Sequence, residues 1–149
     1  MICKIADLLV EVPEAGGMAP RCGEYQWNQE DGAEIVIHRE DAPMLTDAQL
    51  NASWLVGEYV IAPQATRTVA EGDQLTYAGA EITVLHTPGH TPGCVCYQAG
   101  EWLFTGDTLF RMGYGRTDLY GGNAAQLQQS LDRLMKLEGV RAIYPGHDD

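Results

Sequence analysis

Three predicted β-strands in this chain end in the same way, at a glycine followed at once by a residue that can bind a metal ion. The pattern occurs in Thr-Pro-Gly-His, which ends at His90, in Phe-Thr-Gly-Asp, which ends at Asp107, and in Tyr-Pro-Gly-His, which ends at His147. Glycine allows the backbone to reverse, and proline stiffens the approach to the turn. Each of these side chains is therefore expected on a loop just beyond a rigid strand, where proteins commonly present functional groups.

The three residue types suit one another as metal ligands. Two imidazoles and a carboxylate bind zinc and related first-row divalent ions, and the two oxygens of Asp107 allow it to bridge two ions. Asp107 lies 17 residues after His90 and 40 residues before His147, which suits ligands gathered from separate strands and not a zinc finger. Taken singly, a histidine after Pro-Gly is often a surface or capping residue, and Gly-Asp after a strand is often an Asx-turn. The repetition at three strand ends favours the metal site.

The rest of the pattern predicts an α/β domain. Strands are predicted at 33–38, 74–77, 81–86, 95–98, 102–105 and 141–144, with glycine turns after Tyr77 and Gln98. Segment 123–137 predicts an amphipathic helix capped by Asn123 and ended by Gly139. Its apolar stripe consists of Leu127, Leu131, Leu134 and Met135.

Two parts of the N-terminal half are harder to interpret. Thr-Asp-Ala-Gln at 46–49 has the form of a capping box and predicts a short helix that starts at Asp47, with Leu45 and Leu50 as its hydrophobic staple. Residues 5–12 are apolar and fit a strand or a helical turn, and glycines and prolines then interrupt the pattern up to residue 32.

Composition narrows the classes of partner. The chain has 149 residues, a length typical of one domain, and a net charge of −12, which repels nucleic acid and anionic lipid surfaces. Four irregularly spaced cysteines do not form a disulfide framework, and we expect reduced thiols in a cytoplasmic protein. Charged residues interrupt the first apolar run, which is neither a signal peptide nor a membrane span.

Five segments resemble the second half of the metallo-β-lactamase superfamily, in particular its small glyoxalase II-like (hydroxyacylglutathione hydrolase-like) metallo-hydrolases. They are His-Thr-Pro-Gly-His-Thr-Pro-Gly at 86–93, Phe-Thr-Gly-Asp-Thr-Leu-Phe at 104–110, Tyr-Pro-Gly-His at 144–147, Gly-Arg-Thr-Asp-Leu at 115–119 and Ile-His-Arg-Glu-Asp-Ala-Pro-Met-Leu at 37–45. The similarity runs from about Ala33 to His147.

The resemblance implies an αβ/βα sandwich, incomplete at its N-terminus, with the metals at one edge of the sheets. In such enzymes a metal-held hydroxide attacks a thioester, ester, lactone or amide carbonyl, because the metal lowers the pKa of its bound water from ~15.7 towards ~7. By that pattern His90 holds the first ion, His147 holds the second, and Asp107 bridges them as the catalytic residue. Zinc is the expected metal, as one or two ions, with iron or manganese as alternatives. His38 and His86 fall outside the ligand positions, and supporting or packing roles are expected for them.

The chain departs from the family pattern at its N-terminal end, where the His-x-His-x-Asp-His motif is absent. That motif supplies two ligands to each metal, and no two of the four histidines here stand two residues apart. Each ion is left with two protein ligands, whereas catalytic zinc normally has three and a water, so loose binding is expected. Weaker candidates to complete the site are Glu11, Glu14, Cys22 and Asp148. We interpret residues 1–149 as a single truncated domain in which 1–32 are a divergent or irregular start.

Three functions remain open at this point. They are a glyoxalase II-like hydrolase of a small-molecule thioester, ester or lactone, a non-catalytic remnant with at most a weak metal site, and a persulfide-dioxygenase-like iron oxidoreductase. Arg111 and Arg116 follow the aspartate and are placed either to meet an anionic substrate or, more commonly, to brace the loop by pairing with Asp118. Missing N-terminal strands would leave sheet edges and apolar surface uncovered, which favours a homodimer.

Overall fold

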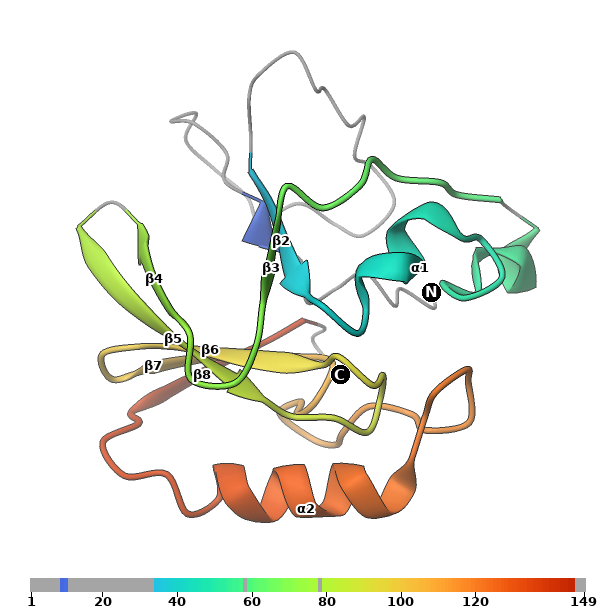
Figure 1. Cartoon of the computed structure of the whole chain (residues 1–149). Helices are drawn as coiled ribbons and strands as arrows, with labels where there is room; N and C mark the ends of the chain where they lie inside the picture. The colour runs from blue at the N-terminus through green and yellow to red at the C-terminus, as the bar shows by residue number, and fades with distance from the viewer. Residues whose placement is uncertain (1–8, 11–33, 58, 78, 147–149) are drawn as a thin grey trace.

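Two β-sheets and a long helix lie one above another in the computed structural model of the chain, in which residues 9–10, 34–57, 59–77 and 79–146 are described (Figure 1). The first sheet has the order β1-β2-β3, formed by Leu9–Val10, Ile35–His38 and Arg67–Val69. The second has the order β4-β5-β6-β7-β8, formed by Gln74–Tyr77, Ala80–His86, Val95–Ala99, Trp102–Gly106 and Ala142–Pro145. Helix α2 (Ala124–Leu134) covers the outer face of the second sheet. The shorter helices α1 (Ala42–Thr46) and η2 (Ser53–Val56) follow β2.

The strand directions bring three strand ends to one edge of the second sheet. β6 is antiparallel to both β5 and β7, and β8 is parallel to β7. β5, β7 and β8 therefore run in the same direction, and their carboxyl ends meet at a single edge. These are the strands that precede His90, Asp107 and His147. The sheet topology thus brings together the three segments that the sequence motifs single out.

Each face of the second sheet has its own hydrophobic core, because side chains alternate along a strand. On β5, Val84 packs with Val36 and Val69 of the first sheet in the core between the sheets. The next residue, Leu85, belongs with Leu103 and Leu134 to the core between the sheet and α2. The second sheet is therefore packed on both faces, against the first sheet on one side and against α2 on the other.

The predicted strands of the second sheet are confirmed to within one residue at each end, and so is the start of α2. Asn123 caps this helix, with its side-chain oxygen accepting the backbone N–H of Gln126 at 3.0 Å. Two residues of the predicted stripe, Leu127 and Leu134, are buried. Met135 is 79% exposed and was wrongly placed in the stripe, because the helix ends at Leu134 and the chain turns away.

The prediction of a short helix from Asp47 is wrong. Helix α1 precedes this residue and ends at Thr46. The Asp47 carboxylate accepts the N–H groups of Gln49 at 2.8 Å and Leu50 at 3.3 Å, so it makes the kind of capping bond that the sequence predicts. The capped segment is a turn instead of a helix. Strand β3 was not predicted, since two of its three residues are exposed and show no buried pattern.

Aromatic side chains remain exposed along β7 and β8. Trp102, Phe104 and Tyr144 are 52%, 42% and 47% exposed, and the rings of Phe104 and Tyr144 stack with their centroids 5.2 Å apart. Among the residues that the structure describes, no helix is long and apolar enough to cross a membrane.

Candidate metal centre

A tight turn after β5 presents His90. The N–H of Thr87 bonds the carbonyl of Cys94 at 2.8 Å, and the N–H of Gly89 bonds the carbonyl of Thr91 at 3.0 Å, which closes the turn. His90 lies at its tip and is only 5% exposed. Gly89 has a φ of +144°, a conformation that L side chains rarely adopt, and this explains the glycine in the motif.

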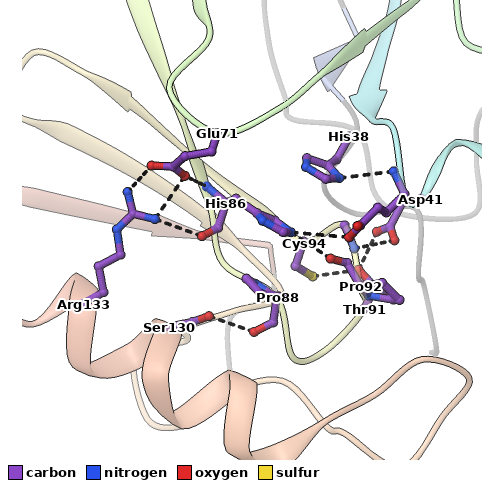
Figure 2. Close-up of polar contacts among 12 residues, drawn as sticks. His38, Asp41, Glu71, His86, Pro88, Thr91, Pro92, Cys94, Ser130 and Arg133 are labelled. Carbon is purple, nitrogen blue, oxygen red and sulfur yellow. Dashed lines mark hydrogen bonds and ion pairs between the residues drawn. The ribbon is translucent and has the colours of Figure 1, made fainter.

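Helix α2 holds this turn from one side. A Cβ added to Gly89 would lie 2.4 Å from the Cα of Leu127, so the helix backbone rests directly on the turn. The N–H of Asn123 bonds the Gly89 carbonyl at 2.8 Å. The buried Ser130 hydroxyl donates to the carbonyl of Pro88 at 2.7 Å (Figure 2). Ser130 lies on the same buried face of α2 as Leu127 and Leu134, so this face both packs on the sheet and bonds the turn.

The segment after β2 holds the same turn from the other side. The buried carboxylate of Asp41 accepts the N–H of Gly93 at 2.7 Å and the hydroxyl of Thr91 (Figure 2). The Thr91 hydroxyl also approaches the sulfur of Cys94 at 3.1 Å. Asp41 lies within the family-like segment 37–45, and these bonds give that segment a structural role at the turn.

His90 faces Asp107 across the edge of the sheet. The Nε2 atom of His90 lies 3.6 Å from Oδ2 of Asp107, and the two residues are 5% and 3% exposed. The Nδ1 atom of His90 lies 2.7 Å from the carbonyl of Arg116. Because a carbonyl only accepts, Nδ1 carries the proton and the lone pair of the ring is on Nε2, on the side of the carboxylate.

This arrangement fits a bound metal ion. His90 Nε2 is buried and makes no hydrogen bond to any described residue, although buried ring nitrogens are normally satisfied. A metal-ligating histidine commonly donates its other N–H to a carbonyl, as His90 does to Arg116. A neutral imidazole and a carboxylate are two of the donors that zinc, iron and manganese accept. The structure therefore brings two of the three predicted ligands together.

The third candidate, His147, lies outside the described residues, but its neighbour Gly146 is placed. The N–H of Gly146 bonds the carbonyl of Gly106 at 2.8 Å, and a Cβ on Gly146 would lie 2.9 Å from Oδ1 of Asp107. The chain thus leaves the described region beside the aspartate. Glu11, Glu14, Cys22 and Asp148 also lie outside the described residues.

The loop after Asp107 packs closely on both predicted ligands. A Cβ on Gly115 would lie 2.0 Å from the Asp107 carbonyl and 3.1 Å from the His90 ring. The next residue, Arg116, pairs with Asp118 through bonds of 2.6 and 2.7 Å, as the loop-bracing interpretation predicts. This pairing lowers the pKa of Asp118 to about 2. Arg111 is exposed.

His38 and His86 form a second polar cluster together with Glu40. The two rings stack with centroids 4.2 Å apart and an angle of 11° between their planes. Glu40 donates its N–H to Nδ1 of His38 at 3.2 Å, and its carboxylate lies 3.8 Å from Nε2 of His86. The sequence predicts supporting or packing roles for the two histidines, and no pattern in it singles out Glu40. No sequence signal joins residues 38 and 86, because they belong to different sheets.

A charged clamp fixes the end of β5 beside this cluster (Figure 2). Glu71 accepts the backbone N–H of His86 at 2.6 Å and pairs with Arg133 of α2, which also donates to the His86 carbonyl at 3.1 Å. The bond from Arg133 lowers the pKa of the Glu71 carboxyl. Both backbone groups of His86 are therefore held.

The chain is similar in sequence to known proteins. The chain is 49% identical over 88 residues to the hydroxyacylglutathione hydrolase of Rhizobium meliloti, an alignment that covers 58% of this chain and 34% of the relative. It is 36% identical over 126 residues to an uncharacterized protein of Mycobacterium leprae, with 78% of this chain and 58% of the relative covered. The chain thus spans between about a third and three fifths of the length of these relatives.

Several solved structures have a similar fold. The BLEG-1 B3 metallo-beta-lactamase superposes with a TM-score of 0.69 at 32% identity, over 76% of this chain and 57% of that one. The TTHA1623 protein in a di-iron-bound form gives 0.67 at 35% identity, over 78% of this chain and 58% of that one. ETHE1 from Myxococcus xanthus superposes with a TM-score of 0.55 at 28% sequence identity, over 78% of this chain and 65% of that one.

These likenesses confirm the fold and the family predicted from the sequence motifs. The model of the metallo-beta-lactamase superfamily matches residues 22–147, which include both sheets from β2 onward, helix α2 and the strand ends that carry the candidate ligands. By its motifs, its fold and this match, the chain belongs to the metallo-beta-lactamase superfamily, a family of metallo-hydrolases.

Proposed function

We propose that this chain is a metal-dependent hydrolase of the glyoxalase II-like type, which cleaves a small-molecule thioester, ester or lactone. The observation that carries the proposal is the buried Nε2 atom of His90, which lies 3.6 Å from the Asp107 carboxylate and makes no hydrogen bond to any described residue. A hydrolase that uses an ion needs an imidazole nitrogen with an available lone pair close to a carboxylate, and His90 and Asp107 provide these two groups.

The residues that would hold the ion are His90 and Asp107, with His147 as the third donor beyond Gly146. A divalent ion bound by these residues would polarise the carbonyl of the substrate and would lower the pKa of a bound water, which would supply a nucleophile near neutral pH. Zinc is our expected metal, with iron or manganese as alternatives, since the TTHA1623 relative was solved with two irons.

The chain itself would orient these donors. The Arg116 carbonyl keeps the Nδ1 proton of His90 in place, so that Nε2 presents its lone pair to the ion. The hydroxyls of Thr87 and Thr108, 2.9 Å apart, join the turn that carries His90 to the one that carries Asp107. Gly115 leaves room for both side chains. The distance between the donors is thereby fixed by bonds that do not involve the ion.

The name of the Rhizobium meliloti relative supports a thioester as the substrate class. A second candidate is a persulfide-dioxygenase-like iron oxidoreductase, which the Gly-Asp-Thr-Leu-Phe and Gly-Arg-Thr-Asp segments and the likeness to the di-iron-bound TTHA1623 protein favour. The donor set agrees with both, because imidazole and carboxylate ligands suit zinc and iron alike.

Elemental analysis of the purified chain, alongside the variant Asp107→Asn, tests the proposal. Asparagine keeps the size of the side chain and removes its charge. We expect the wild-type protein to contain zinc and the variant to have lost part or all of it. We also expect the wild-type protein to hydrolyse an S-acyl glutathione or a lactone, and the rate to fall to background in the variant. Asp132→Asn, an exposed change on α2, serves as the control for charge and should alter neither.

Other outcomes are equally informative. Iron in the wild-type protein with oxygen uptake and no hydrolysis would assign the chain to the oxidative candidate. Equal metal content in the wild-type protein and in Asp107→Asn, with no hydrolysis by either, would overturn the proposal and leave a non-catalytic member of the family.

A further inference from the structure

A group of two histidines and a glutamate lies apart from the His90 and Asp107 pair and shares no residue with it. One potential ligand atom from each of His38, Glu40 and His86 lies within 4.8 Å of the other two. His38 is the last residue of β2 and His86 is the last residue of β5, so the group joins the ends of the two sheets. Its residues are held by described elements alone.

We propose that His38, Glu40 and His86 form a second metal site, for zinc or another first-row divalent ion. Two imidazoles and one carboxylate are the donor set of many catalytic zinc sites and of the facial triad that binds iron, and they leave positions open for water or a further ligand. The inference concerns this donor set alone and does not depend on the proposed hydrolase activity.

A metal ion binds an imidazole through a ring nitrogen that has a lone pair, and the hydrogen bonds of each ring indicate which nitrogen that is. Nδ1 of His38 accepts the N–H of Glu40, so this atom has a lone pair. Nε2 of His86 lies 2.8 Å from the Pro92 carbonyl, which only accepts, so the lone pair of that ring is on Nδ1.

The surroundings also fit an ion. Glu40 and His86 are 51% and 25% exposed at their side chains, which gives an ion access from solvent, whereas His38 is 2% exposed and rigidly packed. The two contacts of Glu40 within the group are long ones that an ion can replace, since its N–H lies 3.2 Å from Nδ1 of His38 and its carboxylate lies 3.8 Å from Nε2 of His86. The Glu71 and Arg133 clamp fixes the backbone of His86.

An ion at this site would fasten the first sheet to the second next to the turn that presents His90. The bond from His86 to Pro92 already connects the group to that turn (Figure 2). Because an ion that binds only the folded state stabilises it, bound metal should raise the melting temperature.

A cobalt titration of the full chain tests the proposal. The protein is stripped of metal with a chelator, and Asp107→Asn is introduced to remove the charged donor of the first centre. We expect this variant to bind Co²⁺ with the visible absorption of a nitrogen- and oxygen-ligated ion and to melt at a higher temperature when loaded. Adding Glu40→Gln or His86→Gln should weaken binding by at least about tenfold, the order of effect seen when groups around a metal are altered.

Glu81→Gln in the same background is the matched control, since Glu81 is also exposed and the variant has the same net charge as Glu40→Gln. Its titration should equal that of the parent. Glu40→Gln is the deciding variant, because the Glu40 side chain is half exposed and its replacement removes no core packing. Circular dichroism checks the fold of each protein. Absence of Co²⁺ binding by Asp107→Asn, or equal binding by the Glu40→Gln and Glu81→Gln variants, would overturn the proposal.

The two proposals can fail separately. If the wild-type protein shows no hydrolysis but Asp107→Asn still binds Co²⁺, the proposed function fails and the second metal site stands. The opposite result is hydrolysis that depends on Asp107 together with equal metal binding by the Glu40→Gln variant and its parent. It would support the proposed function and overturn the second metal site.

Discussion

The carboxylate of Asp41 accepts the backbone N–H of Gly93 at 2.7 Å, although the two residues are 52 positions apart in the chain. This bond ties the segment after the first sheet to the turn that carries His90. A Cβ on Gly93 would lie 2.7 Å from the Asp41 carboxyl carbon, so the glycine is needed for the approach. The position of His90 therefore depends on contacts made far from it in the sequence.

Replacing Asp41 by alanine should destabilise the fold. The Gly93 N–H and the Thr91 hydroxyl would lose a buried acceptor, and an unsatisfied buried donor costs about 1–3 kcal/mol. We expect the free energy of unfolding to fall by about 2–5 kcal/mol in urea titrations. Asp132→Ala, on the exposed face of α2, should change it by no more than about 0.5 kcal/mol, and equal effects of the two changes would contradict this role for Asp41.

The contact between α2 and the histidine turn can be tested at Gly89. Gly89→Ala would place a Cβ 2.4 Å from the Cα of Leu127 and would force a φ of +144° on alanine. We expect a loss of more than about 3 kcal/mol in the free energy of unfolding, or failure to fold.

Gly100→Ala is the control for backbone strain alone, because Gly100 also has positive φ, at 58°, and nothing lies within 4 Å of its Cβ position. That change should cost about 1–2 kcal/mol. A loss at Gly89 no larger than the one at Gly100 would show that the helix does not press on the turn.

The spacing between His90 and Asp107 should depend on Gly115, which is not itself a ligand candidate. A methyl group there would lie 2.0 Å from the Asp107 carbonyl and 3.1 Å from the His90 ring, and it would push the two apart. We expect Gly115→Ala to weaken metal binding by about tenfold or more in isothermal titration, as changes around metal ligands commonly do. Gly113→Ala, with nothing within 4 Å of its Cβ position, should bind like the wild type, and a tight site in Gly115→Ala would count against His90 and Asp107 as joint ligands.

The ion pair between Arg116 and Asp118 should contribute to the stability of the folded protein in a pH-dependent way. The hydrogen bond from Arg116 lowers the pKa of Asp118 to about 2, so the ionised carboxylate is favoured in the folded protein. The contribution of the pair to stability is thus fully present above the ordinary value of 3.8 and is lost as the pH falls through about 2. NMR of the Asp118 carboxyl carbon should show this low pKa, and Arg116→Gln should return it towards 3.8. Titration near the ordinary value in the wild-type protein would mean that the pair does not persist in solution.

Local sequence was sufficient to locate the strands of the second sheet and the start of α2. The strands of this sheet are short alternating runs separated by glycine turns, and such neighbours pair without distant help. Asn123 marks the start of the helix because its side chain bonds only its own first turn. Local signals misled at Asp47, where the same capping chemistry serves a turn, and at Met135, where the helix had already ended.

The order of residues along the chain is enough to single out the candidate metal ligands. Glycine followed by histidine or aspartate at three strand ends predicts His90, Asp107 and His147 as ligands without reference to their positions in space. How His90 and Asp107 come to face each other follows from the tertiary structure. It made β5, β7 and β8 parallel to one another, turned the Nε2 atom of His90 towards Asp107, and stacked His38 on His86. Such contacts depend on the packing of two sheets and a helix, so no local sequence pattern encodes them.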